Sequence, residues 1–187
     1  MEKQNKNNRQ NILDMVLIAM FAVIIAVCSW LSIPGEVPVT LQTFGVFCAV
    51  GLLGGKRGTL SVVIYILLGL VGVPVFAGFK GGVGSLIGPT GGYIIGFVFT
   101  ALVYWLVTKL LGIKIWAVVL GMVLGLVVCY AFGTAWFVLV YSHKNGAISV
   151  MQALSMCVIP FIIPDIVKIT VATILVKVMP KKYLNNK

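Results

Sequence analysis

The sequence has 187 residues, of which 60% are hydrophobic and only 10% are charged. A soluble domain carries about 25% charged residues, so this composition excludes an ordinary soluble protein and indicates a single integral membrane domain, 1–187. The formal net charge of +10 does not indicate a nucleic-acid-binding protein, because the lysines and arginines lie in short connections between apolar stretches, where they set topology.

Six apolar stretches follow one another between charged residues, and each offers roughly the 20 residues that a membrane-spanning helix needs. We therefore expect an all-α integral membrane protein with six transmembrane helices near residues 12–33, 40–55, 58–73, 91–111, 115–141 and 159–179. Pro160 and Pro164 interrupt the last apolar region. We expect a separate short helix near 147–158, with Pro164 starting the sixth span proper.

The basic residues fall on one side of such a six-span arrangement. They occupy the N-terminal tail, the second–third and fourth–fifth connections, and the C-terminal tail. The positive-inside rule therefore predicts that both termini are cytoplasmic. The residues concerned are Lys3, Lys6, Arg9, Lys56, Arg57, Lys109, Lys114, Lys177, Lys181, Lys182 and Lys187.

The connection 74–90 is rich in glycine and lies between two apolar stretches, on the predicted outer side. Irregular backbone at membrane depth is tolerated only where it is buried in protein or lines a cavity, so this segment is a candidate ligand-binding loop. Backbone N–H groups near Gly82 and Gly84, together with Lys80, suit an anion such as a carboxylate. The alternative is that the glycines serve close helix packing.

Asp165 and Lys168 are ionisable residues inside the last apolar stretch, three positions apart on one helix face. Such groups are costly in a membrane and mark functional sites by default, although an internal ion pair that only fixes helix packing is the alternative. No HExxH motif and no serine–histidine pair lies in the membrane stretches. The sequence therefore gives little support to an intramembrane enzyme.

Further candidates lie at the outer ends of the predicted spans. Tyr93 either donates a hydrogen bond to a ligand or belongs to the interfacial aromatic belt. Gln42 and Thr43 head the second span, where they serve as ligand contacts or as helix caps. Trp136 lies near the outer end of the fifth span, where a belt position is the simpler interpretation.

The first span carries small residues at helical spacing, Ala19, Ala22 and Ala26. A face of small residues lets another helix approach closely. The neighbour is either another helix of this chain or an external partner.

Several segments together resemble the BioY family, the biotin-specific substrate-binding (S) component of energy-coupling factor (ECF) transporters. The likeness covers most of the chain, and it differs at Pro164, where the family usually has glycine. The matching segments are Pro38–Thr43, Gly72–Gly78, Gly81–Gly84, Gly88–Tyr93 with Gly96 and Phe97, and Pro160–Lys168.

The resemblance implies a six-helix S-component fold in the cytoplasmic (inner) membrane of a prokaryote, which captures biotin from outside. From the chemistry of biotin we infer that Asp165 accepts hydrogen bonds from the N–H groups of its ureido ring. The donors available for the biotin carboxylate are Lys168, Lys80, the Gly81–Gly84 backbone and Tyr93. We expect the apolar parts of biotin to lie against aromatics such as Phe79 and Trp136.

The resemblance also implies partners, namely a transmembrane T component and two ATP-binding-cassette ATPases, with Ala22 and Ala26 matching an alanine-rich docking helix. No cofactor is expected. The chain carries no phosphate-binding GxxxxGK[ST] motif, so ATP hydrolysis would belong to the partners. A different class of function stays open at this point, namely a stand-alone channel or proton-coupled transporter for a small solute that uses Asp165.

Overall fold

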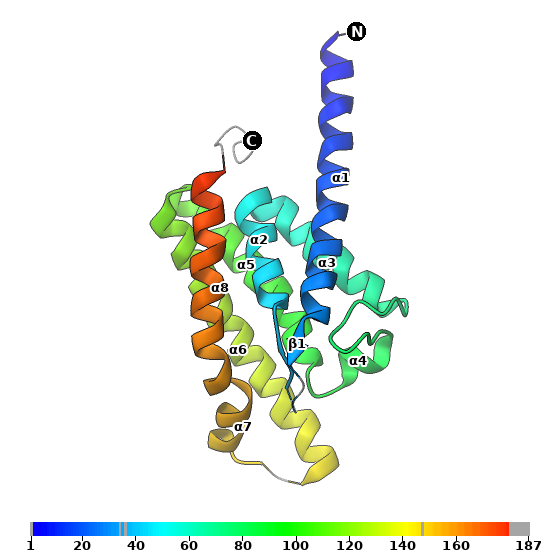
Figure 1. Cartoon of the computed structure of the whole chain (residues 1–187), viewed down its shortest axis with the longest axis vertical. Coiled ribbons are helices and arrows are strands. Elements are labelled where there is room, and N and C mark those ends of the chain that lie inside the picture. Colours follow the sequence, from blue (N-terminus) through cyan, green and yellow to red (C-terminus); the bar gives the residue numbers. More distant parts are fainter. Residues whose placement is uncertain (1, 34, 36, 147, 180–187) are drawn as a thin grey trace.

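The apolar stretches are helical in the computed structural model, which describes residues 2–33, 35, 37–146 and 148–179 (Figure 1). Two very short strands, β1 (Ser32–Ile33) and β2 (Val39–Thr40), pair antiparallel between the first two helices. The helices are α1 (Glu2–Trp30), α2 (Gln42–Leu53), α3 (Gly55–Leu70), α4 (Val83–Ile87), α5 (Gly91–Leu111), α6 (Ile115–Asn145), α7 (Val150–Cys157) and α8 (Ile159–Val178).

Four helical segments among the described residues are long and apolar enough to cross a membrane, namely Asn8–Trp30, Gly91–Leu111, Ile115–His143 and Val150–Val178. The predicted spans 40–55 and 58–73 are also helical, as α2 and α3. They have 12 and 16 residues, fewer than the roughly 20 that a full crossing requires. The described residues thus form a helical protein with four candidate membrane spans.

Helix boundaries differ from the sequence prediction in two places. The first helix begins at Glu2 rather than near residue 12, because no proline or glycine interrupts the polar N-terminal segment; it ends at Trp30, before β1. The last helix begins at Ile159, where the predicted span 159–179 begins, but Pro164 lies inside it rather than at its start. A proline there removes a single backbone donor near the helix start, which membrane helices tolerate.

The short helix predicted near 147–158 is present as α7. Ser149 caps it: its hydroxyl accepts from the Gln152 backbone N–H, and the Gln152 side chain accepts from the Ser149 backbone N–H. This reciprocal cap satisfies two backbone donors that a helix start otherwise leaves free. It explains why the chain forms a separate turn of helix before α8.

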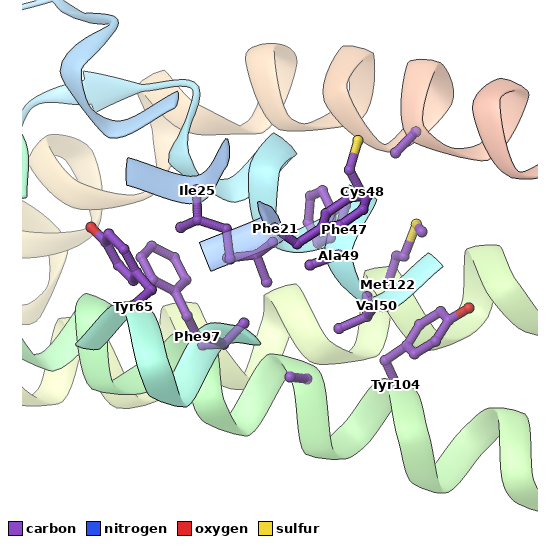
Figure 2. Packing of buried hydrophobic residues seen from close by; sticks show 14 of the residues in the cluster. Phe21, Ile25, Phe47, Cys48, Ala49, Val50, Tyr65, Phe97, Tyr104 and Met122 are labelled. Carbon is purple, nitrogen blue, oxygen red and sulfur yellow. The ribbon is translucent and has the colours of Figure 1, made fainter. Parts of the chain in front are cut away.

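The core joins α1, α2, α3, α5, α6 and α8 through interdigitated apolar side chains (Figure 2). Phe21 and Ile25 of α1 pack with Phe47 and Val50 of α2, and all four are buried. The α5–α6 pair is the most extensive helix contact. It is close because Gly125 lies directly against Thr100, where any side chain would meet the backbone of α5.

The two ends of the molecule differ in character. The N-terminal half of α1 and the C-terminal end of α8 lie at one end, and α4 and α7 lie at the other (Figure 1). At the first end, Arg57 Nε lies 3.0 Å from Asp14 Oδ2, which ties the α2–α3 junction to α1. The lysines Lys181, Lys182 and Lys187, which contribute to the topology prediction, lie outside the described residues, as do the side chains of Lys3 and Lys6.

Candidate functional site

A cavity of about 610 Å³ lies at the end of the bundle opposite to the α5–α6 connection. This is a typical volume for a small-molecule site. Its lining combines the β1–β2 region, the start of α2, the loop after α3, the start of α5, the middle of α6, and the α7–α8 region. The polar lining residues are Ser32, Thr40, Gln42, Thr43, Lys80, Ser85, Thr90, Tyr93, Tyr130, Asp165 and Lys168.

Asp165 and Lys168 form a buried ion pair on α8, with Lys168 Nζ 2.7 Å from Asp165 Oδ1. The Asp165 side chain is 1% exposed and that of Lys168 is 7% exposed. A buried charge needs a partner and further hydrogen bonds to offset its lost hydration. The structure supplies both, as the surrounding contacts show.

Lys168 has three N–H donors, and all three have acceptors. Besides Asp165, its ammonium donates to the Thr40 carbonyl at 2.7 Å and to Thr43 Oγ1 at 3.0 Å. Thr43 in turn donates its hydroxyl hydrogen to Asp165 Oδ1 at 2.8 Å. The start of α2 therefore closes around the ion pair of α8.

The other carboxylate oxygen, Asp165 Oδ2, accepts a hydrogen bond from the Tyr130 hydroxyl of α6. We call Asp165, Lys168, Thr43 and Tyr130 the polar network. Its donors all bond to groups of the protein, so the positions it leaves unused are acceptor positions on Asp165 Oδ2 and on the hydroxyl oxygens. The network is suited to a ligand that brings N–H groups.

Gln42 is a buried amide beside this network. Its Nε2 donates to the Tyr65 hydroxyl at 2.7 Å, which fixes the amide orientation. An amide has two N–H donors and a carbonyl, so Gln42 retains one donor and its acceptor beyond this bond. Gln42 therefore has a donor that a ligand carbonyl next to the network can accept from.

The loop 74–90 covers one side of the cavity, and three side-chain hydrogen bonds from flanking helices hold it. Ser29 donates its hydroxyl to the Val75 carbonyl, Trp30 donates its indole N–H to the Pro74 carbonyl at 2.9 Å, and Trp136 donates to the Gly88 carbonyl at 3.0 Å. Within the loop, Phe76 and Lys80 exchange backbone hydrogen bonds. The loop is therefore an ordered wall rather than an open connection.

The structure brings seven of the predicted binding residues to one cavity: Gln42, Thr43, Lys80, Gly84, Tyr93, Asp165 and Lys168. Tyr93 shares a hydrogen bond of 2.8 Å with the Thr134 hydroxyl on α6. Lys80 is exposed, and it enters the lining from the loop 74–90 rather than from α8.

Three predicted residues are not in the lining: Phe79, Gly82 and Trp136. Phe79 is 65% exposed and stacks on Trp30 at 5.2 Å between ring centroids, with a positive φ of 56°. Trp136 contacts the loop 74–90 instead, where its indole N–H donates to the Gly88 carbonyl. Gly82 also has a positive φ and turns the chain into α4.

The predicted docking face of the first helix needs a correction. Ala22 and Ala26 are buried in the core against other helices of this chain, and only Ala19 is exposed. The close neighbour is α2, where a side chain at Gly45 would touch the backbone of Ile25. Ala22 and Ala26 therefore pack against other helices of this chain, which is the first of the two alternatives for this small-residue face.

Tyr130, Phe76, Phe97 and Phe161 also line the cavity, although none of them was predicted from the sequence as a binding residue. A signal for Tyr130 exists. Tyr130 and Thr134 stand four residues apart, on one face of an otherwise apolar stretch. The aromatic residues carry no such signal, because apolar side chains fill every span. Among the described residues, no cluster of three or more metal-ligating side chains occurs.

Comparison with known proteins identifies relatives over nearly the whole chain. A sequence model of the BioY family matches residues 2–185. The biotin transporter BioY of Thermotoga maritima is 42% identical over 164 residues, which cover 87% of this chain and 92% of that protein. The probable biotin transporter BioY of Pyrococcus horikoshii is 39% identical over 164 residues, which cover 87% and 93%.

A solved structure has the same fold. It is a crystal structure of the S-component for biotin from an ECF-type ABC transporter, with a TM-score of 0.81 and 30% identity over 91% of this chain and 92% of that chain. The family resemblance predicted from the sequence motifs is thus confirmed.

Proposed function

This chain belongs to the BioY family, and on that premise we propose that it captures biotin with high affinity and mediates its uptake as the S component of an ECF-type ABC transporter. The observation that carries the proposal is that the polar network and the exposed Lys80 of the loop 74–90 line one cavity of about 610 Å³. These two features match the two polar ends of biotin.

The ureido ring of biotin faces Asp165 in our proposal. The three N–H donors of Lys168 bond to Asp165, Thr40 and Thr43. The network therefore offers acceptor positions to a ligand, and its ammonium has no donor left for a ligand carboxylate. Each ureido N–H is a donor, and a hydrogen bond to a carboxylate is stronger than one between neutral groups. Gln42 supplies a donor for the ureido carbonyl.

The carboxylate of biotin then lies toward Lys80, on the loop 74–90. Lys80 lines the cavity, and no acidic group lies within ion-pair distance of it among the described residues. This departs from the sequence-based expectation that Lys168 is a carboxylate donor. The apolar thiophane ring and chain of biotin lie between the two ends, against the buried rings of Phe76, Phe97 and Phe161.

We propose six membrane crossings, with both termini cytoplasmic and the cavity open to the outside. The basic residues Lys56, Arg57, Lys109 and Lys114 lie at the helix junctions opposite the cavity end, which suits the positive-inside rule. The short helices α2 and α3 would cross with help from the adjoining segments 32–41 and 71–73. The membrane is the cytoplasmic membrane of a prokaryote.

The proposed partners are a T component and two ATP-binding-cassette ATPases, which would supply the energy. The chain itself is not an enzyme in this proposal. Co-purification of these subunits from cells that contain the complete transporter tests this part. Biotin uptake into liposomes that contain this chain alone, driven by a pH gradient, would instead favour the stand-alone transporter.

Biotin titration of the detergent-purified protein tests the proposed function directly. Intrinsic tryptophan fluorescence is a suitable readout, because Trp30 and Trp136 both hold the loop beside the cavity. We expect saturable binding of about one biotin per chain with a Kd in the nM range, which corresponds to about −12 kcal/mol. Folded protein without saturable biotin binding would refute the proposal.

A further inference from the structure

Tyr130 holds a position in the polar network that its other members do not share. Its hydroxyl donates to Asp165 Oδ2, whereas Lys168 and Thr43 both bond to Oδ1. It reaches the carboxylate from α6, a different helix from the one that carries the ion pair. Its side chain also lines the cavity.

The two oxygens of Asp165 are therefore compensated unequally. Oδ1 faces an ammonium at 2.7 Å and a hydroxyl at 2.8 Å, which together fill its acceptor positions. Oδ2 has a single neutral donor, so it retains one acceptor position and more of the negative charge. The Tyr130 hydroxyl is the group that moderates the charge that a ligand meets at Oδ2.

We propose that Tyr130 is a specificity-determining residue, which tunes Asp165 to accept a neutral cyclic urea in preference to a cationic ring of the same shape. The inference rests on the proposed biotin function. A guanidinium ring gains most from a bare carboxylate oxygen, and it must give up its hydration in a largely apolar cavity. A phenol hydroxyl bonded to Oδ2 reduces the binding energy that the cation gains there. It still leaves one acceptor position on Oδ2 for a neutral N–H group.

A pair of ligands that differ only at the ring tests the proposal. In 2-iminobiotin an imino group replaces the ureido carbonyl, and the ring is a cation at neutral pH. The ratio of the Kd for 2-iminobiotin to the Kd for biotin measures the discrimination. We expect Tyr130→Phe to lower this ratio about tenfold, a change of ~1.4 kcal/mol. Tyr104→Phe is the matched control, since Tyr104 is buried in the core outside the lining, and it should leave the ratio unchanged.

The outcomes separate this inference from the proposed function. A wild-type protein that does not bind biotin overturns the function. A wild-type protein that binds biotin, with the same ratio in Tyr130→Phe, overturns the role of Tyr130 alone. If Tyr130→Phe does not fold, 3-fluorotyrosine at position 130 decides, because its hydroxyl is a stronger donor. The ratio should then rise, and an unchanged or lower ratio would overturn the proposal.

Discussion

Lys168 donates to Asp165 Oδ1 at 2.7 Å from one helical turn away, and both side chains are nearly inaccessible to solvent. A buried pair of this kind contributes little net stability against two apolar residues, yet removing one partner is costly because the other charge remains buried. The pair therefore makes different predictions for single and double substitutions.

Lys168→Met should destabilise the protein by about 3 kcal/mol in the free energy of unfolding, because Asp165 would stay buried without its cation. The double variant Asp165→Asn/Lys168→Met should recover most of that loss. Thermal unfolding in detergent measures both, and Lys177→Met, at an exposed position of the same helix, is the control. Equal stability of the single and double variants would contradict the buried-charge argument.

Asp165→Asn should weaken biotin binding by more than 1 kcal/mol, because hydrogen bonds from the ligand to a carboxylate become bonds to a neutral amide. A biotin titration measures the change. Asp14→Asn is a closely matched control, because Asp14 is the other aspartate of the chain and pairs with Arg57 at the end opposite the cavity. A normal affinity in Asp165→Asn would leave Asp165 with a purely structural role.

Lys80→Gln should remove the preference of the site for the free carboxylate of biotin. Wild-type protein should bind biotin more tightly than biotinamide, in which the carboxylate is a neutral amide, and the variant should bind the two about equally. Two titrations of each protein provide the comparison. Lys109→Gln, in the last turn of α5, should keep the wild-type preference. A preference that survives Lys80→Gln would place the carboxylate elsewhere.

The sequence predicted those features that depend on composition and local pattern. Long uncharged stretches gave the four long spans, and Pro160 with the residues before it gave the separate short helix α7. The strands β1 and β2 were not predicted, because two-residue strands carry no alternating pattern. The position of Pro164 inside α8 was not predicted, because a proline near the start of a helix is equally consistent with the first helical residue.

The candidate site shows the same division. Asp165 and Lys168 were found because charge is rare in apolar stretches. Tyr130 was not found, because its partner on α8 lies 35 residues away and only the tertiary fold brings the two together. Burial separated Ala22 and Ala26 from Ala19, since spacing alone cannot distinguish a helix face that meets its own chain from one that meets a partner.

Gly91→Ala should destabilise the fold by about 2 kcal/mol, the usual cost of forcing a group into a filled space. Gly91 begins α5 directly against the backbone of Leu86, so an added methyl group would meet the Leu86 carbonyl. Gly84→Ala is the matched control, because a side chain there has open space around it. Thermal unfolding of the two variants provides the test, and equal melting temperatures would show that the α4–α5 turn relaxes without cost.

Trp136→Phe should speed the dissociation of biotin, because the loop 74–90 would lose the indole N–H that holds the Gly88 carbonyl at 3.0 Å. One hydrogen bond contributes about 1 kcal/mol, which predicts roughly a five-fold higher dissociation rate if the loop must open before biotin leaves. Displacement of labelled biotin by an excess of unlabelled biotin measures that rate. Trp116→Phe is the control, since Trp116 is 52% exposed near the start of α6, far along that helix from the cavity. An unchanged dissociation rate in Trp136→Phe would show that biotin leaves without opening this end of the loop.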